Sequence, residues 1–336
     1  MSLKLLAAVV LVVRLWFTCE TASAEEFAVY FKISPDQAQV TPSLPATLSL
    51  TLEKPGQSAA GEEWLTVRLD APPPGFFFST DFPVVEDSRL LEARLPVVGG
   101  KTEWRQLLPI RGEYRLTASL HAASGLDAER TFTFYVHENR RKWFYLGTFA
   151  FGLFLIGIIA GRIFSAPRKV KRGQLSILLV LCLTPFGLAG DAACAQENHE
   201  QKYAVNLDVS PARVGRLARV RWSMRTAGFE GNSSAHLSII VTQLEKNTVV
   251  FSIEKLPVAG EFAFDYQFTD GSNHRVSAVA VTSEGEIIRE DHLVSVSAMA
   301  PPWRAQLPAL LLFLVVILSG LLLGRWSRGL AIVKTK

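Results

Sequence analysis

Four apolar runs interrupt an otherwise polar chain, at Leu5–Phe17, Trp143–Phe164, Leu175–Ala189 and Leu307–Leu323. A helix needs about 20 apolar residues to cross the hydrocarbon core of a membrane. The second and fourth runs, taken with their flanks, reach that length. Two long polar stretches separate the runs, so the pattern predicts a membrane protein with two polar domains.

Inside both polar stretches, apolar and polar residues alternate with a period of two, as they do along half-buried strands. Segments with this pattern include 114–121, 130–137, 205–209, 236–241, 275–281 and 293–296. Short strands separated by turn residues over ~100 residues are typical of an immunoglobulin-like sandwich. We therefore expect a mainly β chain with transmembrane α-helices: two Ig-like antiparallel β-sandwiches, each followed by a transmembrane helix.

The two halves of the chain repeat one order of segments: a signal-like segment, a polar domain, an apolar helix and a basic end. Three short matches have the same order in both halves: Ser34-Pro35 with Ser210-Pro211, Leu95-Pro96-Val97 with Leu256-Pro257-Val258, and Gly161-Arg162 with Gly324-Arg325. Leu95 and Arg162 are 67 positions apart, and Leu256 and Arg325 are 69 apart. We interpret the chain as a tandem duplication of one module.

The start of the chain has the features of a secretory signal peptide. Residues 1–24 contain a basic start, an apolar stretch and Ala22-Ser23-Ala24 at the position of a cleavage site. Arg14 interrupts the apolar stretch, and an uncleaved anchor helix is the alternative. Both interpretations send the first polar domain, 25–141, across the membrane.

Basic residues assign the sides of the membrane. A transmembrane helix is expected at 143–164, and the loop after it, 165–173, is rich in Lys and Arg. A second helix is expected at 304–324, and a basic tail of residues 325–336 follows it. Because cytoplasmic loops are enriched in Lys and Arg, both basic segments are expected in the cytoplasm. We expect a multi-pass protein of the bacterial inner membrane with large extracytoplasmic domains.

The segment 174–195 returns the chain to the outside and has two interpretations. It is apolar but short, contains Pro185, and ends in Ala193-Cys194-Ala195. It is either a transmembrane helix or an internal signal-like segment that is cut before Gln196. In both cases the second polar domain, 196–302, lies on the same side as the first.

Charge and cysteine content exclude several classes of protein. Residues 25–140 carry 11 basic and 16 acidic side chains, and residues 196–300 carry 10 and 13, although the whole chain has a net charge of +4. Two acidic domains do not form a nucleic-acid-binding surface. All three cysteines lie outside the polar domains, so no disulfide bond is expected to stabilise either one.

No constellation for catalysis or metal binding emerges from the sequence. Motifs for nucleophilic hydrolysis, zinc binding, thiol chemistry and phosphate binding are absent. The histidines on the predicted strands, His121, His137, His274 and His292, are too far apart in pairs to share one metal ion, and we interpret them as histidines at the surface or at strand ends. We expect no enzyme activity, no cofactor and no metal site.

Two features are candidates for interaction with other molecules. Both expected helices carry a pair of glycines four residues apart, Gly157 and Gly161 in the first and Gly320 and Gly324 in the second. Such pairs let another helix approach closely, although common ancestry is the simpler explanation. A proline-rich stretch with three aromatic residues is a candidate partner-binding loop, and the alternative is a loop that folds back to cap the sandwich; its residues are Pro72, Pro73, Pro74, Phe76, Phe77 and Phe78.

The ends of both polar domains resemble small membrane-anchored Ig-like periplasmic modules of the YtkA/FixH-like kind. The resemblance rests on Gly112-Glu113-Tyr114-Arg115-Leu116, on Phe134-Tyr135-Val136, and on residues 271–281 of the second half. This resemblance, together with the histidines, implies an accessory protein for copper handling or oxidase assembly, which we keep as the alternative. The duplication, the sandwich fold and the lack of catalytic groups favour a membrane-anchored periplasmic accessory protein for binding or scaffolding, with another envelope or membrane protein as partner.

Overall fold

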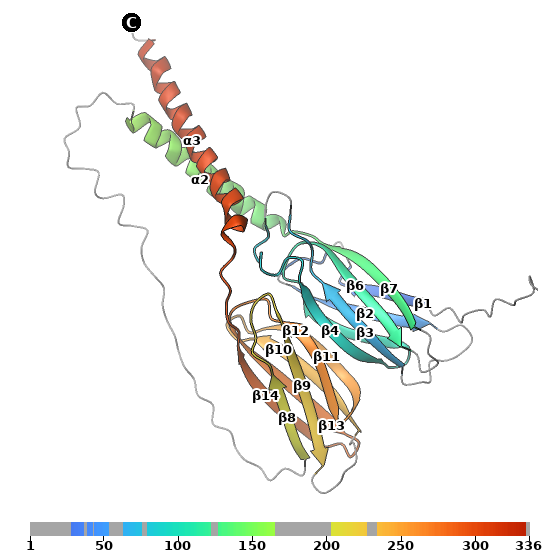
Figure 1. The fold of residues 1–336 in the computed structure, drawn as a ribbon. Coiled ribbons are helices and arrows are strands. Elements are labelled where there is room, and N and C mark those ends of the chain that lie inside the picture. The colour runs from blue at the N-terminus through green and yellow to red at the C-terminus, as the bar shows by residue number, and fades with distance from the viewer. Residues whose placement is uncertain are drawn as a thin grey trace, which may run out of the picture. The chain divides into compact units, whose positions relative to one another are not determined.

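A computed structural model describes residues 28–36, 39–42, 44–53, 63–75, 79–121, 127–164, 203–226 and 234–333. The expected signal peptide at 1–24, the basic loop at 165–173 and the segment at 174–195 lie outside these residues. The described part of the chain forms two compact units, a β unit and a helical unit. Figure 1 shows the strands in blue to green for the first half of the chain and in yellow to orange for the second.

Seven strands come from each half of the chain. Those of the first half are β1 (Ala28–Ser34), β2 (Pro45–Glu53), β3 (Glu63–Asp70), β4 (Arg89–Val97), β5 (Lys101–Leu107), β6 (Gly112–His121) and β7 (Asp127–Val136). Those of the second half are β8 (Tyr203–Val209), β9 (Leu217–Thr226), β10 (Ser234–Gln243), β11 (Thr248–Ala259), β12 (Glu261–Gln267), β13 (Asn273–Thr282) and β14 (Ile287–Ser295). Four of the six segments with period-two alternation lie within these strands, and 130–137 and 293–296 extend one residue beyond β7 and β14.

The same strand order occurs in both halves. The first half places β1-β2-β5 in one sheet and β7-β6-β3-β4 in the other, and the second half places β8-β9-β12 and β14-β13-β10-β11 in the corresponding positions. Neighbouring strands pair antiparallel, for example β3 with β4 and β6 with β7. The expected fold class, antiparallel β-sandwiches with two apolar helices, is confirmed.

The halves are not separate sandwiches, however, because their sheets are continuous. β5 of the first half pairs with β11 of the second, and β4 pairs with β12, which gives two sheets of seven strands each. Each half taken alone would leave these strands at a sheet edge, with unpaired backbone N–H and C=O groups. Pairing between the halves satisfies these groups, and the sequence pattern did not reveal it.

The inner faces of the sheets supply an apolar core in each half. Val67 and Leu116 are fully buried in the first half, as are Leu237 and Val276 in the second. Each half also buries one tryptophan, Trp104 or Trp222. Within the second half, Phe251 packs on Phe264 and Tyr266 with ring centroids 5.2 and 5.1 Å apart. No disulfide bond is needed, because buried apolar area provides the main favourable free energy of folding.

Tyr114 forms a corner that is characteristic of Ig-like sandwiches. It lies near the start of β6, where its hydroxyl donates to Ile110 O at 2.7 Å and accepts from Ile110 N at 3.1 Å. A tyrosine bonded to the backbone a few residues upstream is the tyrosine corner of this fold. Burial raises the pKa of Tyr114 far above its usual value, so the hydroxyl stays protonated and can donate.

His274 occupies the corresponding position in the second half. Tyr114 pairs with Phe134 in the β6–β7 hairpin, and His274 pairs with Val294 in the β13–β14 hairpin. His274 is 2 % exposed, so it is not a surface histidine, although it lies at a strand end as the second residue of β13. The cause is the register, which turns this side chain toward the core, where its ring meets that of Phe268 at 5.1 Å.

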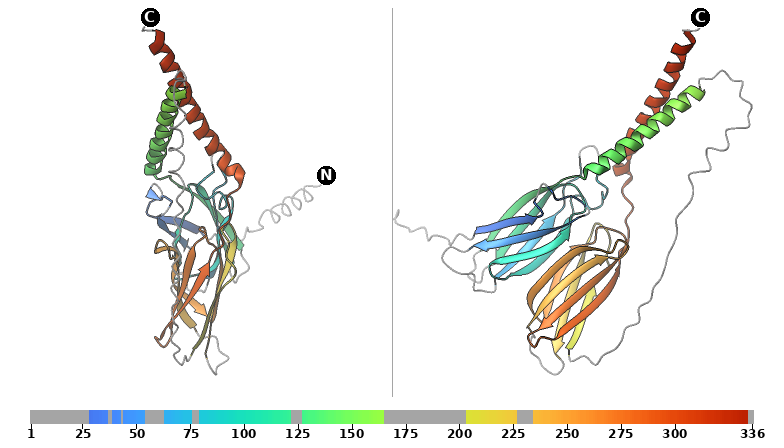
Figure 2. Two further views of the ribbon diagram at one scale, coloured as in Figure 1. Left: turned by 90° about the vertical axis from the view of Figure 1, so that its left-hand side faces the viewer. Right: turned by 180° about the vertical axis from the view of Figure 1, so that it is seen from behind.

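The helical unit contains α2 (Arg140–Phe164) and α3 (Trp303–Val333). Residues 141–164 and 303–327 are long and apolar enough to cross a membrane. Large apolar side chains are exposed along both helices, with Phe144 at 73 %, Phe151 at 61 % and Leu310 at 64 %. α2 and α3 pack against each other (Figure 2). Pro308 lies inside α3, as its sixth residue, where its missing N–H removes one backbone hydrogen bond of the helix.

The buried imidazole predicts a loss of stability in acid. Desolvation by burial lowers the pKa of His274, and this outweighs the hydrogen bond from Nδ1 to Ser272 O and the negative charges of Asp270 and Glu245. As the pH falls below the usual pKa of 6.5, the unfolded chain therefore binds a proton before the folded one does. The free energy of unfolding should decrease from pH 6.5 downward, measured by denaturant titration of the full chain in detergent.

A matched pair of variants isolates this effect. His274→Phe should flatten the acid dependence, because phenylalanine does not titrate. Tyr114→Phe, at the equivalent position, should lower the free energy of unfolding by about 1–3 kcal/mol through its lost hydrogen bonds, and by the same amount at every pH from 5 to 7. An acid dependence that survives in His274→Phe would contradict the assignment.

Candidate functional site

The four glycines proposed for helix packing lie at the contact between α2 and α3. A Cβ atom added to Gly157 would lie 2.5 Å from Ile317 O and 3.1 Å from Gly320 Cα. A Cβ atom added to Gly320 would meet Phe154 O, and would lie 3.2 Å from Gly157 Cα. These positions leave no room for a side chain, so the two backbones are in direct contact.

One turn further along, the other two glycines make the same kind of contact. A Cβ atom at Gly161 would overlap Leu321 O, and one at Gly324 would overlap Ile158 O. Gly157 lies against Gly320, and Gly161, one turn later in α2, lies near Arg325, which is also later in α3. The two helices therefore run parallel. Two further contacts flank the glycines, between the rings of Phe149 and Phe313 at 5.4 Å and between Arg162 Nε and Ser327 Oγ at 3.4 Å.

The candidate partner-binding loop belongs to a connection that is long only in the first half. β3 and β4 are joined by residues 71–88, which we call the extension, whereas β10 and β11 are joined by residues 244–247. Pro72 is buried and would contact a Cβ atom at Gly112, while Pro73 and Pro74 are exposed. Phe76, Phe77 and Phe78 lie outside the described residues.

The second part of the extension is fixed by contacts within the first half. Val85 is fully buried, Thr80 N donates to Glu86 Oε1 at 2.5 Å, and Asp87 N donates to Pro72 O at 2.9 Å. The exposed prolines therefore lie on a connection whose end is held against the sandwich.

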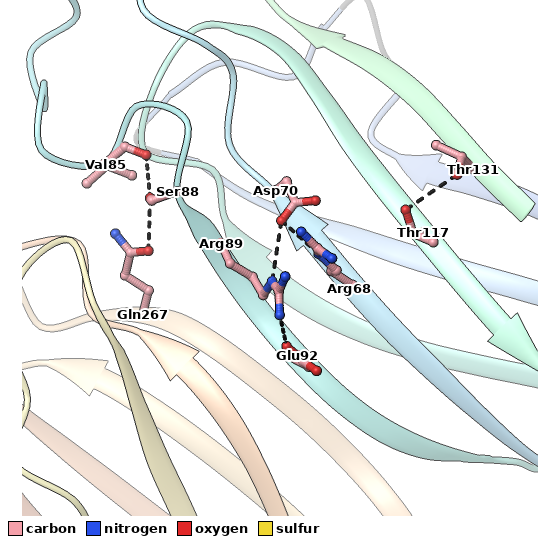
Figure 3. Close-up of polar contacts among 9 residues, drawn as sticks. All are labelled: Arg68, Asp70, Val85, Ser88, Arg89, Glu92, Thr117, Thr131 and Gln267. Carbon is pink, nitrogen blue, oxygen red and sulfur yellow. Dashed lines mark hydrogen bonds and ion pairs between the residues drawn. The ribbon is translucent and has the colours of Figure 1, made fainter. Parts of the chain in front are cut away.

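The extension also contacts the second half of the chain. Ser88 Oγ donates to Val85 O at 2.5 Å and lies 3.0 Å from the side-chain amide of Gln267 (Figure 3). In one orientation of the Gln267 amide, both its nitrogen and its oxygen are hydrogen-bonded. In that orientation Nε2 donates to Ser88 Oγ, and Oε1 accepts from Gly215 N at 3.3 Å. A Cβ atom at Gly215, which has φ +82°, would lie 2.9 Å from Val84 O. This close approach requires glycine.

A chain of ion pairs lies beside this contact on the outer face of the same sheet. Arg89 pairs with Glu92 and lies 3.6 Å from Asp70 Oδ1, which also accepts from Arg68 Nε at 3.1 Å (Figure 3). These groups are partly exposed, so each pair stabilises the fold by little. The alternation of charges across β3 and β4 instead fixes their side-chain positions next to the junction between the halves.

The described residues contain no group of three or more His, Cys, Asp or Glu side chains that could hold a metal ion. His274 pairs with Val294, and His292 pairs with Val276 on the neighbouring strand. His274 is buried in the core, and its Nδ1 is bonded to Ser272 O.

Sequence reasoning missed the contact between the extension and the second half. Gln267, Ser88, Gly215 and Val84 carried no recognisable motif, because a serine, a glutamine and a glycine in loops have many ordinary roles. The sequence does contain one signal, a difference in spacing: Ser34 and Leu95 are 61 positions apart, whereas Ser210 and Leu256 are 46 apart. It indicates additional residues in the first half, without showing what those residues touch.

No family model and no curated protein matches the chain. Some solved structures resemble parts of it. A conjugative transposon lipoprotein from Bacteroides eggerthii shares 9 % identity, covers 28 % of this chain and 96 % of its own, and has a TM-score of 0.22. CopC from Methylosinus trichosporium OB3b shares 16 % identity, covers 29 % of this chain and 97 % of its own, and also has a TM-score of 0.22.

A longer but equally weak likeness extends over both halves. The native conformation of E. coli alpha-2-macroglobulin shares 10 % identity, covers 84 % of this chain and 14 % of its own, and has a TM-score of 0.25. Likenesses at this level carry no argument about function. The site is therefore argued from the residues of this chain alone.

The glycine contact predicts which substitutions separate the helices. Gly161→Ile should push α2 from α3, because its Cβ atom would occupy the position of the Leu321 carbonyl. Gly152→Ile is the matched control on the same helix, since no atom lies within 4 Å of a Cβ atom there. With cysteines introduced at Phe149 and Phe313 and the native cysteines replaced, cross-linking in membranes should fall several-fold for Gly161→Ile only.

Isoleucine favours the membrane interior, so both variants should insert equally well, and expression level checks this. Equal cross-linking yields for Gly161→Ile and Gly152→Ile would show that the glycines do not control the approach of the helices.

Proposed function

We propose that the chain is a non-catalytic, membrane-anchored accessory protein of the bacterial inner membrane, which displays its β unit on the outer side and binds another envelope protein there. The observation that carries this proposal is the exposed apolar surface of α2 and α3. Phe144, Phe151, Ile159, Leu310 and Leu322 are each more than half exposed. Burying such surface is favourable by about 25 cal/mol per Å², so a membrane is its natural environment.

The parallel direction of the helices supports a third crossing. α2 begins three residues after β7 ends, and α3 follows β14 after a short connection, so both helices leave the β unit at their N-terminal ends. If both cross the membrane in parallel, the chain must return between Phe164 and Tyr203 to form β8. The apolar segment at 174–195 would provide that return, whether it remains as a helix or is cut afterwards.

The extension is the proposed partner-binding element. It presents Pro73 and Pro74 at the surface, next to the three phenylalanines of the sequence, and its end is fixed by the contacts of Val85 and Ser88. Rigid prolines and aromatic residues lose little conformational entropy on binding. The second half has only four residues at the corresponding place, so this surface occurs once in the molecule.

Accessibility of single cysteines tests the topology. With native cysteines replaced, Lys101→Cys on β5 and Lys246→Cys after β10 should react with a membrane-impermeant maleimide in cells with a permeabilised outer membrane. Both lysines are more than half exposed, at 52 % and 66 %. Lys334→Cys in the basic tail should react only after lysis. Labelling of position 246 only after lysis would contradict the shared outer location of the two halves.

Site-specific photo-cross-linking tests the partner-binding element. A photoreactive residue at Pro73 should give a discrete cross-linked species in membranes, whereas one at Glu245, exposed in the corresponding connection of the second half, should not. The cross-link should disappear when residues 73–78 are replaced by a Gly/Ser segment of equal length. An identical cross-linking pattern at both positions would exclude a specific role for the extension.

A further inference from the structure

The two halves of the chain pair with each other in both sheets, and the residue pairs in one sheet correspond to those in the other. In one sheet, β4 pairs with β12 through Leu91↔Tyr266, Glu92↔Asp265 and Ala93↔Phe264. In the other sheet, β11 pairs with β5 through Phe251↔Gln106, Ser252↔Arg105 and Ile253↔Trp104. Each residue of the first half differs by 160 from its counterpart in the second. Leu91 thus corresponds to Phe251, and Gln106 to Tyr266, so exchanging the halves turns one set of pairs into the other.

The same difference of 160 runs through the hairpins that follow. His121↔Asp127 closes the register of β6 with β7, and Val281↔Ile287 closes that of β13 with β14. Outside the junction, Leu69↔Leu91 in the first half corresponds to Val241↔Phe251 in the second. Leu91 and Phe251 again differ by 160, whereas Leu69 and Val241 differ by 172 because they precede the connection that is longer in the first half. A left-handed residue, Lys255 with φ 55°, lies in β11. The pairing of β10 with β11 shifts by one residue next to Lys255, so β11 contains one additional residue there. For this reason the residue numbers of Leu95 and Leu256, which come after the shift, differ by 161 instead of 160.

The contacts between α2 and α3 are also exchanged between the halves, and here corresponding residue numbers differ by 163. Gly157 lies against Ile317 and Gly320, and Gly320 lies against Phe154 and Gly157. Adding 163 to Phe154 gives Ile317, and adding 163 to Gly157 gives Gly320. The next glycines behave alike, since Gly161 meets Leu321 O and Gly324 meets Ile158 O, and Ile158 and Leu321 again differ by 163.

We propose that the two halves are copies of one self-associating module and recognise each other as the subunits of a two-fold dimer, so that the covalent connection between them is not needed to hold them together. When residue i of one copy contacts residue j of the other and j of the first contacts i of the second, the interface is isologous. A head-to-tail arrangement would not exchange its contacts in this way. The partner that fits the β4–β5 edge is thus a second copy of the same module. This inference stands independently of the proposed function.

The charges at the junction have diverged from that symmetry. Glu92 and Asp265 are directly opposite each other across the halves, and the corresponding pair in the other sheet is Ser252 and Arg105. Like charges directly opposite on neighbouring strands are destabilising. A symmetric dimer of the first half would instead place Glu92 opposite Arg105 twice. The existing junction therefore contains one repulsive pair that a single substitution can remove.

Cutting the connection tests the proposal in the full chain. A recognition sequence for a site-specific protease, inserted after Glu200, allows cleavage of the purified protein in mild detergent. With an affinity tag at the C-terminus only, the N-terminal fragment should stay bound in a 1:1 ratio after complete cleavage. Release of the N-terminal fragment into the wash would overturn the proposal.

Charge variants then test the register of the junction. Asp265→Asn should slow dissociation of the cleaved halves by about two- to fivefold, because it removes the repulsion with Glu92, and this gain should vanish at 1 M salt. The neighbour Arg219 faces Asp265 within one half, so that contact is present before and after dissociation and does not affect the comparison. Glu261→Gln, on the same strand but outside the three pairs, is the control.

Equivalent substitutions test the two-fold relation. Gly161→Ile and Gly324→Ile should each speed dissociation of the cleaved halves, and by similar factors, because the two glycines make exchanged contacts. Retention of the uncleaved protein in one size-exclusion peak shows that each variant folds. Faster dissociation for only one of the two glycine variants, or equal effects of Asp265→Asn and Glu261→Gln, would rule out the two-fold arrangement.

Discussion

Backbone pairing at the edges of β4, β5, β11 and β12 is the constraint on which the β unit depends. A sandwich of seven strands has edges wherever its sheets stop, and unpaired backbone groups at an edge invite association with other chains. In this protein, two of those edges in each half are paired with the other half. The outer edges that remain are β1 and β14 of one sheet and β7 and β8 of the other. β14 alternates exposed charged residues such as Arg289 and Asp291 with partly buried ones, which is a common protection of an exposed edge.

The core and the junction stabilise different parts of the structure. Leu65, Leu237 and their neighbours would be buried in either half alone, because they lie between the two sheets of that half. The strands that pair across the halves add a second contribution, since backbone pairing of β5 with β11 and of β4 with β12 satisfies N–H and C=O groups that either half alone would leave at an edge.

The fold class followed from the sequence because period-two alternation and the absence of cysteines in the polar domains leave few alternatives to a sandwich with an apolar core. The continuity of the sheets could not be predicted, since Leu91, Ala93 and Phe264 have the same apolar character whether their strand is central or at an edge. The glycines of α2 and α3 were identifiable from their spacing, but the identity of their neighbour was not. The burial of His274 was missed because the sequence does not show which face of its strand the side chain takes, and a shift of one residue in register reverses the face of every side chain on a strand.

The extension between β3 and β4 has a consequence for stoichiometry. An object built from two equivalent modules presents each surface twice, and an interaction through any of those surfaces would recruit two identical partners. The extension is present in one half only, and Ser88 and Val84 contact Gln267 and Gly215 in the other, so it makes the two halves different. A surface that occurs once can form a one-to-one complex, and it gives a β unit whose halves share one strand order a single orientation for whatever binds it.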